Sequence, residues 1–266
     1  MRIGRRICIM KVFNNIFFKI LIIIGLVFLV SCPHKNPQEI VEWEEVPIPK
    51  FKFKAIQIPQ TLVQSSDTMA QKIVEYINSA NDFKRYLYYL NPPDTVAPES
   101  YYPPWNYSWY AREGYRILLK VEIFFETNVW MVRFWGTDSI TGKYYHNWHY
   151  LGADQYAGND YGSMGVSPND ELNTSTSFQW TTENEVVKYI FLKTSDDGQV
   201  FFDFEIHCFA DFSGQLIKRI KISDRKFYWR EIDGIIEYKF SWNAVGSGQW
   251  WKYDVEGNVI DTGSWN

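Results

Sequence analysis

The sequence predicts a mainly β protein of the α+β type, with an antiparallel meander that forms a strongly bent sheet or a partial barrel. One N-terminal amphipathic helix is expected to pack on this sheet. Three observations predict the fold. After Tyr115, apolar residues recur at every second position through most of the chain, as in strands with one buried face. Turn-forming dipeptides separate these runs. One earlier segment instead has apolar residues at steps of three and four, which is the period of a helix.

The first 31 residues have the charge order of an export signal. The leader contains basic residues and no acidic ones: Arg2, Arg5, Arg6, Lys11 and Lys19. The apolar run that follows, residues 20–30, would cover only about half of a ~30 Å hydrocarbon layer at ~1.5 Å per helical residue. This length favours a cleaved signal peptide over a spanning helix. An uncleaved anchor and a translation start at Met10 both remain open.

Leu29, Val30, Ser31 and Cys32 end this run. The four residues resemble the lipobox of bacterial lipoproteins, in which an aliphatic residue stands three positions before a cysteine that follows a small residue. The resemblance implies cleavage before Cys32 and attachment of lipid, including palmitate, at that cysteine. Pro33 stands where an aspartate would imply inner-membrane retention in enteric bacteria. We therefore expect a lipid-anchored protein of the cell envelope, in the outer membrane if the host has one.

Removal of the leader makes the chain strongly acidic. All 31 acidic residues lie after residue 31, whereas five of the 27 basic residues are lost with the leader. The mature net charge of about −9 would repel phosphate backbones and anionic head groups. Nucleic acid is thus an unexpected partner, and contact with the membrane is expected to come from the lipid at Cys32.

Cysteine usage predicts a domain without disulfides. Cys8 lies in the leader and Cys32 would carry lipid, which leaves Cys208 as the one remaining thiol. Because Cys208 continues an alternating apolar run, we expect it to be a small core side chain.

Residues 32–60 are predicted to form an extended, proline-rich tether between the anchor and a single folded domain at 61–266. Prolines at this density disfavour both helix and sheet. They are Pro33, Pro37, Pro47, Pro49 and Pro59. Phe51 and Phe53 alternate with lysines, so a first strand in this region is an open alternative.

The amphipathic helix is expected to begin at Ser65 or Ser66, whose hydroxyl can accept from free amides of the first turn. Asn91, followed by two prolines, ends it. Its apolar face would pack on the sheet, and consists of Met69, Ile73, Ile77, Ala80 and Leu87.

Ten strands are predicted to follow and to pair antiparallel in sequence order. Their ranges are 117–125, 129–135, 143–150, 186–194, 199–209, 215–222, 226–232, 235–242, 249–253 and 259–263. Glycine-containing turns are expected at Gly198, Gly214, Gly234 and Gly257, where tight hairpins need positive φ.

Two long linkers, 91–112 and 152–177, are expected to interrupt the meander. The first is rich in aromatic residues, which suit stacking on sugar rings or capping an apolar cavity. The candidate ligand-binding residues are Trp105, Trp109, Tyr110 and Trp148. The alternative is that these rings pack over the edge of the sheet.

Two weaker resemblances bear on architecture. The C-terminal stretch from Gln249 to Trp265 resembles one hairpin of the bacterial MORN-type repeats, although its glycines recur at unequal intervals. The order of a helix followed by an antiparallel meander is similar to the half-barrel carriers of the Lol type, in which sheet and helix enclose an apolar hollow.

Candidate catalytic or metal-binding groups are few. Asp203, Glu205 and His207 are predicted to share one strand face, where they would either do acid and base work or form a solvated surface. His146 and His149 would point to opposite faces of a strand, so joint metal ligation would need a bend or a loop there. Asp154, Asn159 and Asp160 could approach a calcium ion but lack the one-three-five spacing of a known loop. No phosphate-binding loop or nucleophile elbow is present, and the sequence indicates neither a cofactor nor a metal.

Two classes of function remain open. The first is a non-enzymatic binding or assembly lipoprotein that presents aromatic loops or a concave sheet face to a glycan, an apolar ligand or an envelope protein. The second is an envelope polysaccharide hydrolase that uses acidic residues such as Asp203 and Glu205.

Overall fold

The computed structural model describes residues 46–167, 176–194, 200–220 and 235–266. The predicted signal peptide, Cys32, the predicted strand at 226–232 and the predicted turns at Gly198 and Gly234 lie outside the described residues.

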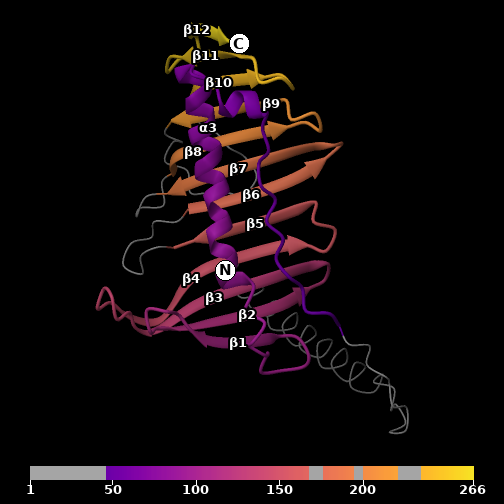
Figure 1. Cartoon of the computed structure of the whole chain (residues 1–266), viewed down its shortest axis with the longest axis vertical. Coiled ribbons are helices and arrows are strands. Elements are labelled where there is room, and N and C mark those ends of the chain that lie inside the picture. Colours follow the sequence, from indigo (N-terminus) through magenta and orange to yellow (C-terminus); the bar gives the residue numbers. More distant parts are fainter. Residues whose placement is uncertain (1–45, 168–175, 195–199, 221–234) are drawn as a thin grey trace, which may run out of the picture. The chain divides into compact units, whose positions relative to one another are not determined.

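The described chain forms one open sheet of twelve strands, and each strand pairs antiparallel with the next one in sequence (Figure 1). This arrangement confirms the predicted mainly β meander with a helix packed on it; the sheet is not closed into a barrel. The strands are β1 (Trp105–Tyr110), β2 (Arg116–Phe124), β3 (Thr127–Thr137), β4 (Tyr144–Tyr156), β5 (Tyr161–Val166), β6 (Thr176–Glu183), β7 (Val186–Thr194), β8 (Val200–Cys208), β9 (Gly214–Ile220), β10 (Ile235–Trp242), β11 (Gly248–Tyr253) and β12 (Val259–Trp265).

The predicted linkers are wrong in part, because they contain strands. The range 91–112 holds all of β1, and the range 152–177 holds the end of β4, all of β5 and the start of β6. The pattern of β1 alternates aromatic and polar residues and was hidden by the surrounding prolines. The small residues of β5 resemble a loop, but they pair with β4 on one side and β6 on the other, and Trp180 of β6 fills the space over Gly162.

The helix begins one or two residues later than predicted. A short helix, α2 (Gln60–Val63), precedes α3 (Thr68–Asn81). The cap of α3 is Asp67, whose carboxylate accepts from the amides of Met69 and Ala70 at 2.8 and 3.0 Å, so the prediction of a Ser65 or Ser66 cap is wrong. A carboxylate is favoured there because it also faces the positive end of the helix dipole. The helix continues through η1 (Asp82–Tyr86) and α4 (Leu87–Leu90), giving 23 helical residues in all.

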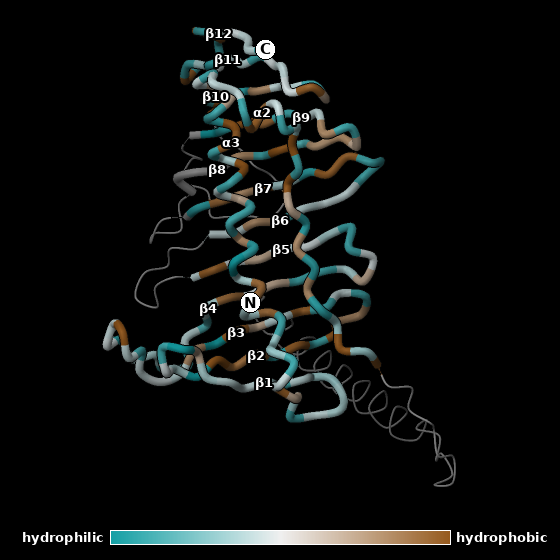
Figure 2. Tube along the Cα trace, in the orientation of Figure 1, coloured by the Kyte–Doolittle hydropathy of each residue, from teal (hydrophilic) through white to brown (hydrophobic). Residues whose placement is uncertain are grey.

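The helix crosses the strands of the sheet instead of running along them (Figure 1). We call the sheet face beneath it the helix face. The buried residues of α3 are spaced as predicted and comprise Ala70, Ile73, Ile77 and Ala80. Aromatic contacts join the two layers: the rings of Phe83 and Phe178 lie 5.8 Å apart, and those of Tyr76 and Phe204 lie 5.7 Å apart. Figure 2 shows apolar residues along the strands that pass under the helix.

Residues 47–59, which the sequence assigns to the tether, belong to the folded domain. They form neither the tether nor the alternative first strand, but an extended segment that runs beside α3 on the helix face (Figure 1). Phe51 and Ile56 are buried, and the ring of Phe51 meets that of Trp130 edge-on at 5.1 Å. The compact unit therefore begins at Pro47 and not at residue 61.

Side-chain amides replace the missing strand partner of this segment. Asn81 accepts from the amide of Ile56 at 2.8 Å and donates to its carbonyl at 3.0 Å. Gln155 makes the same pair of bonds with Lys52, at 3.0 and 2.8 Å. Asn91 makes it with Phe51, at 3.1 and 3.3 Å. Extended backbone that is buried must be paired, and three amides from separate elements satisfy that need here.

The turn prediction at Gly214 is also wrong. In the β8–β9 turn the positive φ of 65° falls on Phe212, whereas Gly214 is the first residue of β9. A Cβ at Gly214 would lie 2.5 Å from Cζ2 of Trp242 on β10, so this glycine makes room for an indole. Gly257 does adopt a turn conformation, with a φ of 87°, as predicted.

Candidate functional site

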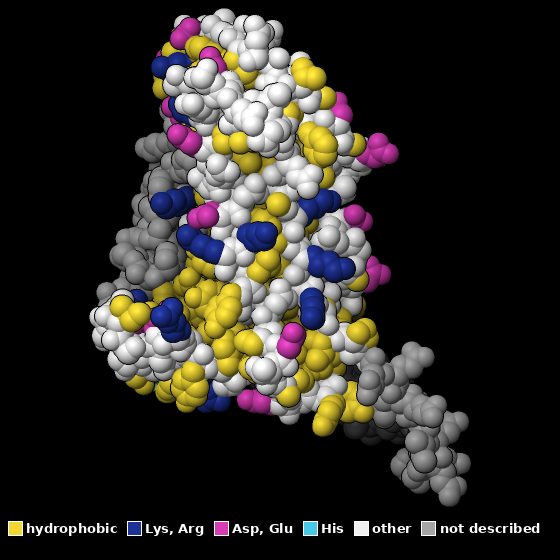
Figure 3. Space-filling model, in the orientation of Figure 1, with side chains coloured by type: hydrophobic (Ala, Val, Ile, Leu, Met, Phe, Trp, Pro, Cys, Tyr) yellow, Lys and Arg dark blue, Asp and Glu magenta, His cyan; other side chains and the backbone are white. Residues whose placement is uncertain are grey.

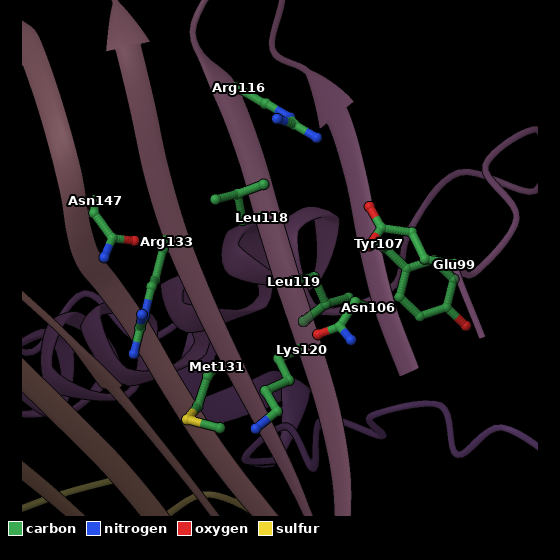
Figure 4. Close-up of a pocket in the computed structure, with 10 residues that line it drawn as sticks. All are labelled: Glu99, Asn106, Tyr107, Arg116, Leu118, Leu119, Lys120, Met131, Arg133 and Asn147. Atoms are coloured by element: carbon green, nitrogen blue, oxygen red, sulfur yellow. The ribbon is translucent and has the colours of Figure 1, made fainter. Parts of the chain in front are cut away.

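A candidate site is a groove on the sheet face opposite the helix, over β1–β4. Its cavity has a volume of about 520 Å³ (Figure 4). We call it the β1–β4 groove. It is lined by Glu99, Asn106, Tyr107, Arg116, Leu118, Leu119, Lys120, Met131, Arg133 and Asn147.

The alternation of side chains along β2 determines which of its residues face the groove. Arg116, Leu118 and Lys120 alternate with the buried residues of β2 and therefore lie on the face away from the helix. On β3, Arg133 is opposite Leu118, and Met131 is opposite Lys120. Leu118 and Met131 are half-buried and supply an apolar surface between the cationic side chains.

The cations of the groove differ in how they are held. Nζ of Lys120 lies 2.5 Å from a carboxylate oxygen of Glu122. Nε of Arg116 donates to the hydroxyl of Ser108, and its terminal nitrogens have no hydrogen-bond partner among the described residues. Within the described ranges, neither Arg116 nor Arg133 forms an ion pair. The charge of Arg133 is nonetheless felt on β4, because desolvation together with this charge lowers the pKa of His149.

Asn147 reaches the groove from an irregular part of β4. The pairing of β3 with β4 shifts register between Val132 and Arg133 and again between Phe134 and Gly136. Asn147 has a φ of 53°, a left-handed conformation that asparagine tolerates better than most residues. Bulges of this kind redirect side chains and are common beside functional sites. The sequence shows no signal for this bulge.

The four predicted ligand-binding residues do not form one surface. Trp105, Trp109 and Trp148 are buried, the first two on the helix face of β1. Tyr110 is 73% exposed at the end of β1. The tryptophans therefore pack over the sheet, which was the structural alternative, and only Tyr110 presents its ring to solvent.

The predicted face of β8 carries an ion network around Glu205. Glu205 is 7% exposed and lies 3.0 Å from Lys188, 2.5 Å from His207 and 3.5 Å from Arg219. Burial would raise the pKa of Glu205, but the hydrogen bonds from His207 and Lys188 and the charges of Lys188 and Arg219 outweigh it and lower the pKa to about 2. A carboxylate held in its ionised form is poorly suited to act as a general acid. The side chain of Asp203 lies outside the described part of the structure.

The residues of the candidate calcium group, Asp154, Asn159 and Asp160, make separate contacts. Asp154 accepts from the hydroxyl of Ser163 on the face away from the helix, and burial raises its pKa. Asn159 instead accepts from Gln155, which lies on the helix face. The structure thus separates Asp154 from Asn159, and the amide of Thr182 engages the backbone carbonyl of Asp160.

The two candidate histidines make unrelated contacts. The ring of His146 lies 4.8 Å from that of Trp135, whereas His149 is opposite Arg133 on β3. Among the described residues, no three side chains of histidine, cysteine, aspartate or glutamate gather as metal ligands would. Cys208 is buried, as expected, and burial raises the pKa of its thiol to about 12.

None of the helices in the described ranges combines the length and apolar character that crossing a bilayer requires. No protein-family model matches the chain, and no curated protein matches it significantly. The lipobox, MORN-type and Lol-type resemblances therefore stay predictions from the sequence.

Proposed function

We propose that this protein is a lipid-anchored binding protein of the cell envelope, and that its ligand occupies the β1–β4 groove. One observation carries this proposal: a cavity of about 520 Å³ in which cationic and amide side chains surround an apolar surface. Ligand sites in proteins have volumes of this order and combine apolar walls with a few polar groups. The role is binding and not catalysis, and a glycan, a lipid or an envelope protein is the partner.

The anchoring part of the proposal comes from the sequence. The residues Leu29-Val30-Ser31-Cys32 resemble a lipobox, and Cys32 would carry the lipid. The domain that begins at Pro47 would then be held at the surface of an envelope membrane, the outer membrane in a host that has one. One acyl chain gives only reversible membrane binding, so stable anchoring needs the multiple chains that a lipidated cysteine can carry.

The packing of the helix face argues against two narrower roles. Carriage of lipid in a hollow between sheet and helix has less support, because rings of the sheet pack against α3, η1 and residues 47–59. The cavities on this side, of about 470 and 460 Å³, lie along the flanks of the helix. Figure 3 views this face and shows apolar side chains at its surface mainly over the lower strands. A glycan platform built of tryptophans would need exposed indoles, and three of the four candidate rings are buried.

The alternative of a polysaccharide hydrolase has less support. Glu205 already has three partners and a low pKa, which suits an ion network that stabilises the sheet. No converging pair of carboxylates lies in the β1–β4 groove, where Glu99 is the one acidic residue.

Two measurements test the proposal. Labelled palmitate should be incorporated by the native protein and not by Cys32→Ala, and the variant should change its processing and membrane fractionation. Native mass spectrometry of protein purified from host membranes should show a co-purifying sugar, lipid or polypeptide. Palmitate incorporation that is independent of Cys32 would contradict the anchor, and a protein recovered without any bound species would contradict the binding role.

A further inference from the structure

The charges of the β1–β4 groove oppose the charge of the chain as a whole. Three of the ten lining residues are cationic and one is acidic, although the complete chain has a net charge of −4. Farther along the same sheet face, Lys188 and Arg219 both contact the carboxylate of Glu205. The groove is thus a local positive region on an acidic protein.

Arg116 and Arg133 lie on the same sheet face, but Figure 4 shows their guanidinium groups pointing apart: Arg116 extends toward β1, where its Nε donates to Ser108, and Arg133 extends away from Arg116. Arg116 is opposite Trp135, so Arg133, two residues earlier on β3, is its diagonal neighbour on the same face. Diagonal neighbours in an antiparallel pair are separated by about 7–8 Å. Arginine reaches across such a gap and binds carboxylate and phosphate oxygens with paired N–H groups. One anion can bind both guanidinium groups when the side chain of Arg116 turns from Ser108 toward β3.

The remaining lining residues describe the rest of the ligand. Leu118 and Met131 give a half-buried apolar surface between the arginines and Lys120, which suits the C–H face of a sugar ring. Asn106 and Asn147 lie on the strands that flank β2 and β3, where their amides can donate to and accept from hydroxyl groups (Figure 4). Both the anionic group and the polar ring thus find matching side chains.

We propose that the β1–β4 groove binds an acidic saccharide, whose carboxylate or phosphate group is held by Arg116 and Arg133 and whose ring packs on Leu118 and Met131. This inference rests on the proposed function and specifies the class of its ligand. The ion pair between Lys120 and Glu122 leaves the two arginines as the principal cations for the anionic group.

Calorimetric titration of the full chain in detergent tests this inference with two matched pairs of probes. One pair is a galacturonate trimer and its methyl ester; the other is glucose 6-phosphate and glucose. In at least one pair, the charged member should bind at least about tenfold more tightly than the neutral member, because charge-assisted hydrogen bonds are lost with the charge. The pair that shows this preference identifies the anion as a carboxylate or a phosphate. Equal binding within both pairs, or no binding of either charged probe, would overturn the proposal.

Variants locate the binding. Arg116→Met and Arg133→Met keep an unbranched stem and remove the guanidinium group and its charge, and each should weaken binding of the preferred charged probe about tenfold or more. Arg85→Met removes the same charge from the exposed surface of η1 and should leave affinity unchanged. Thermal melting of all three variants controls for folding. If the groove variants melt like the native protein and still bind normally, the groove is not the site.

The two proposals fail separately. Loss of palmitate labelling would remove the anchor and leave the titrations intact. Failure of both charged probes, with a neutral sugar or a polypeptide found by native mass spectrometry, would leave a binding protein with a different ligand.

Discussion

Gly162 on β5 lies directly beneath the indole of Trp180 on β6. The two residues are opposite each other in the sheet, and a Cβ at Gly162 would stand 2.2 Å from Cζ2 of Trp180. The indole Nε1 has no hydrogen-bond partner in the described chain, so packing alone holds the ring. The rings of Phe51 and Phe53 from the N-terminal segment lie 5.8 and 6.1 Å from it. The same relationship recurs between Gly214 and Trp242.

Gly162→Ala should therefore destabilise the domain. The added methyl must displace the indole, and overpacking of this kind costs about 1–3 kcal/mol, or roughly 2–4 °C of melting temperature per kcal/mol in a domain of this size. Gly165→Ala is the matched control on the same strand, because nothing lies within 4 Å of its Cβ position. Thermal unfolding followed by circular dichroism compares the two. Equal melting temperatures would contradict the close approach of Gly162 and Trp180.

Asp67→Ala should lower the free energy of unfolding by about 1 kcal/mol, because two amides of the first turn of α3 lose their acceptor. Ser66→Ala should have little effect, since Ser66 is exposed and does not cap the helix. Urea denaturation of both variants separates the two caps. A larger loss for Ser66→Ala would restore the cap that the sequence predicts.

Asn81→Ala should loosen the segment 47–59 from the sheet. It leaves the amide and carbonyl of Ile56 without partners, and a buried unpaired polar group costs about 1–3 kcal/mol. Hydrogen exchange at Ile56 should become faster while exchange in the distant strands β11 and β12 stays slow. Asn78→Ala, an exposed change on the same helix, is the control. Unchanged exchange at Ile56 would show that Asn81 does not hold the segment.

Glu205→Gln should lower the free energy of unfolding at neutral pH. It should also make that free energy depend less on pH in the acid range. The folded pKa of about 2 lies below the ordinary value of 4.5, so the ionised carboxylate stabilises the native state above about pH 4.5. This contribution, on the order of 2–3 kcal/mol, is lost as the pH falls from about 5 to 2. Glu183→Gln, at an exposed position, provides the comparison. If the free energy of unfolding fell equally with decreasing pH in the native protein and in Glu205→Gln, the ion network would not stabilise the fold.

The sequence was most reliable where a single period governs a long segment. β7 and β10 coincide with their predicted ranges. In β10, aromatic residues alternate with polar ones from Glu237 to Trp242, so a single choice of buried face covers the rings. The buried face of α3 was predicted for the same reason. The aromatic residues were harder to interpret, since an exposed binding ring and a buried core ring have the same composition. Burial of Trp105 follows from the register of β1 with β2, which composition does not contain.

Local sequence by itself therefore determined the strand and helix periods and the antiparallel order of the strands, whereas the export signal in the leader stays a prediction. Tertiary structure decided what depends on residues far apart in the chain. Asn81 and Gln155 satisfy the backbone of residues 47–59 only after the helix and β4 have been brought to it, which converts a predicted tether into part of the domain. The β1–β4 groove likewise exists only because pairing sets Arg116 and Arg133 on neighbouring strands. Hydrogen bonds and charges act through space, and the sequence fixes their partners only once it is folded.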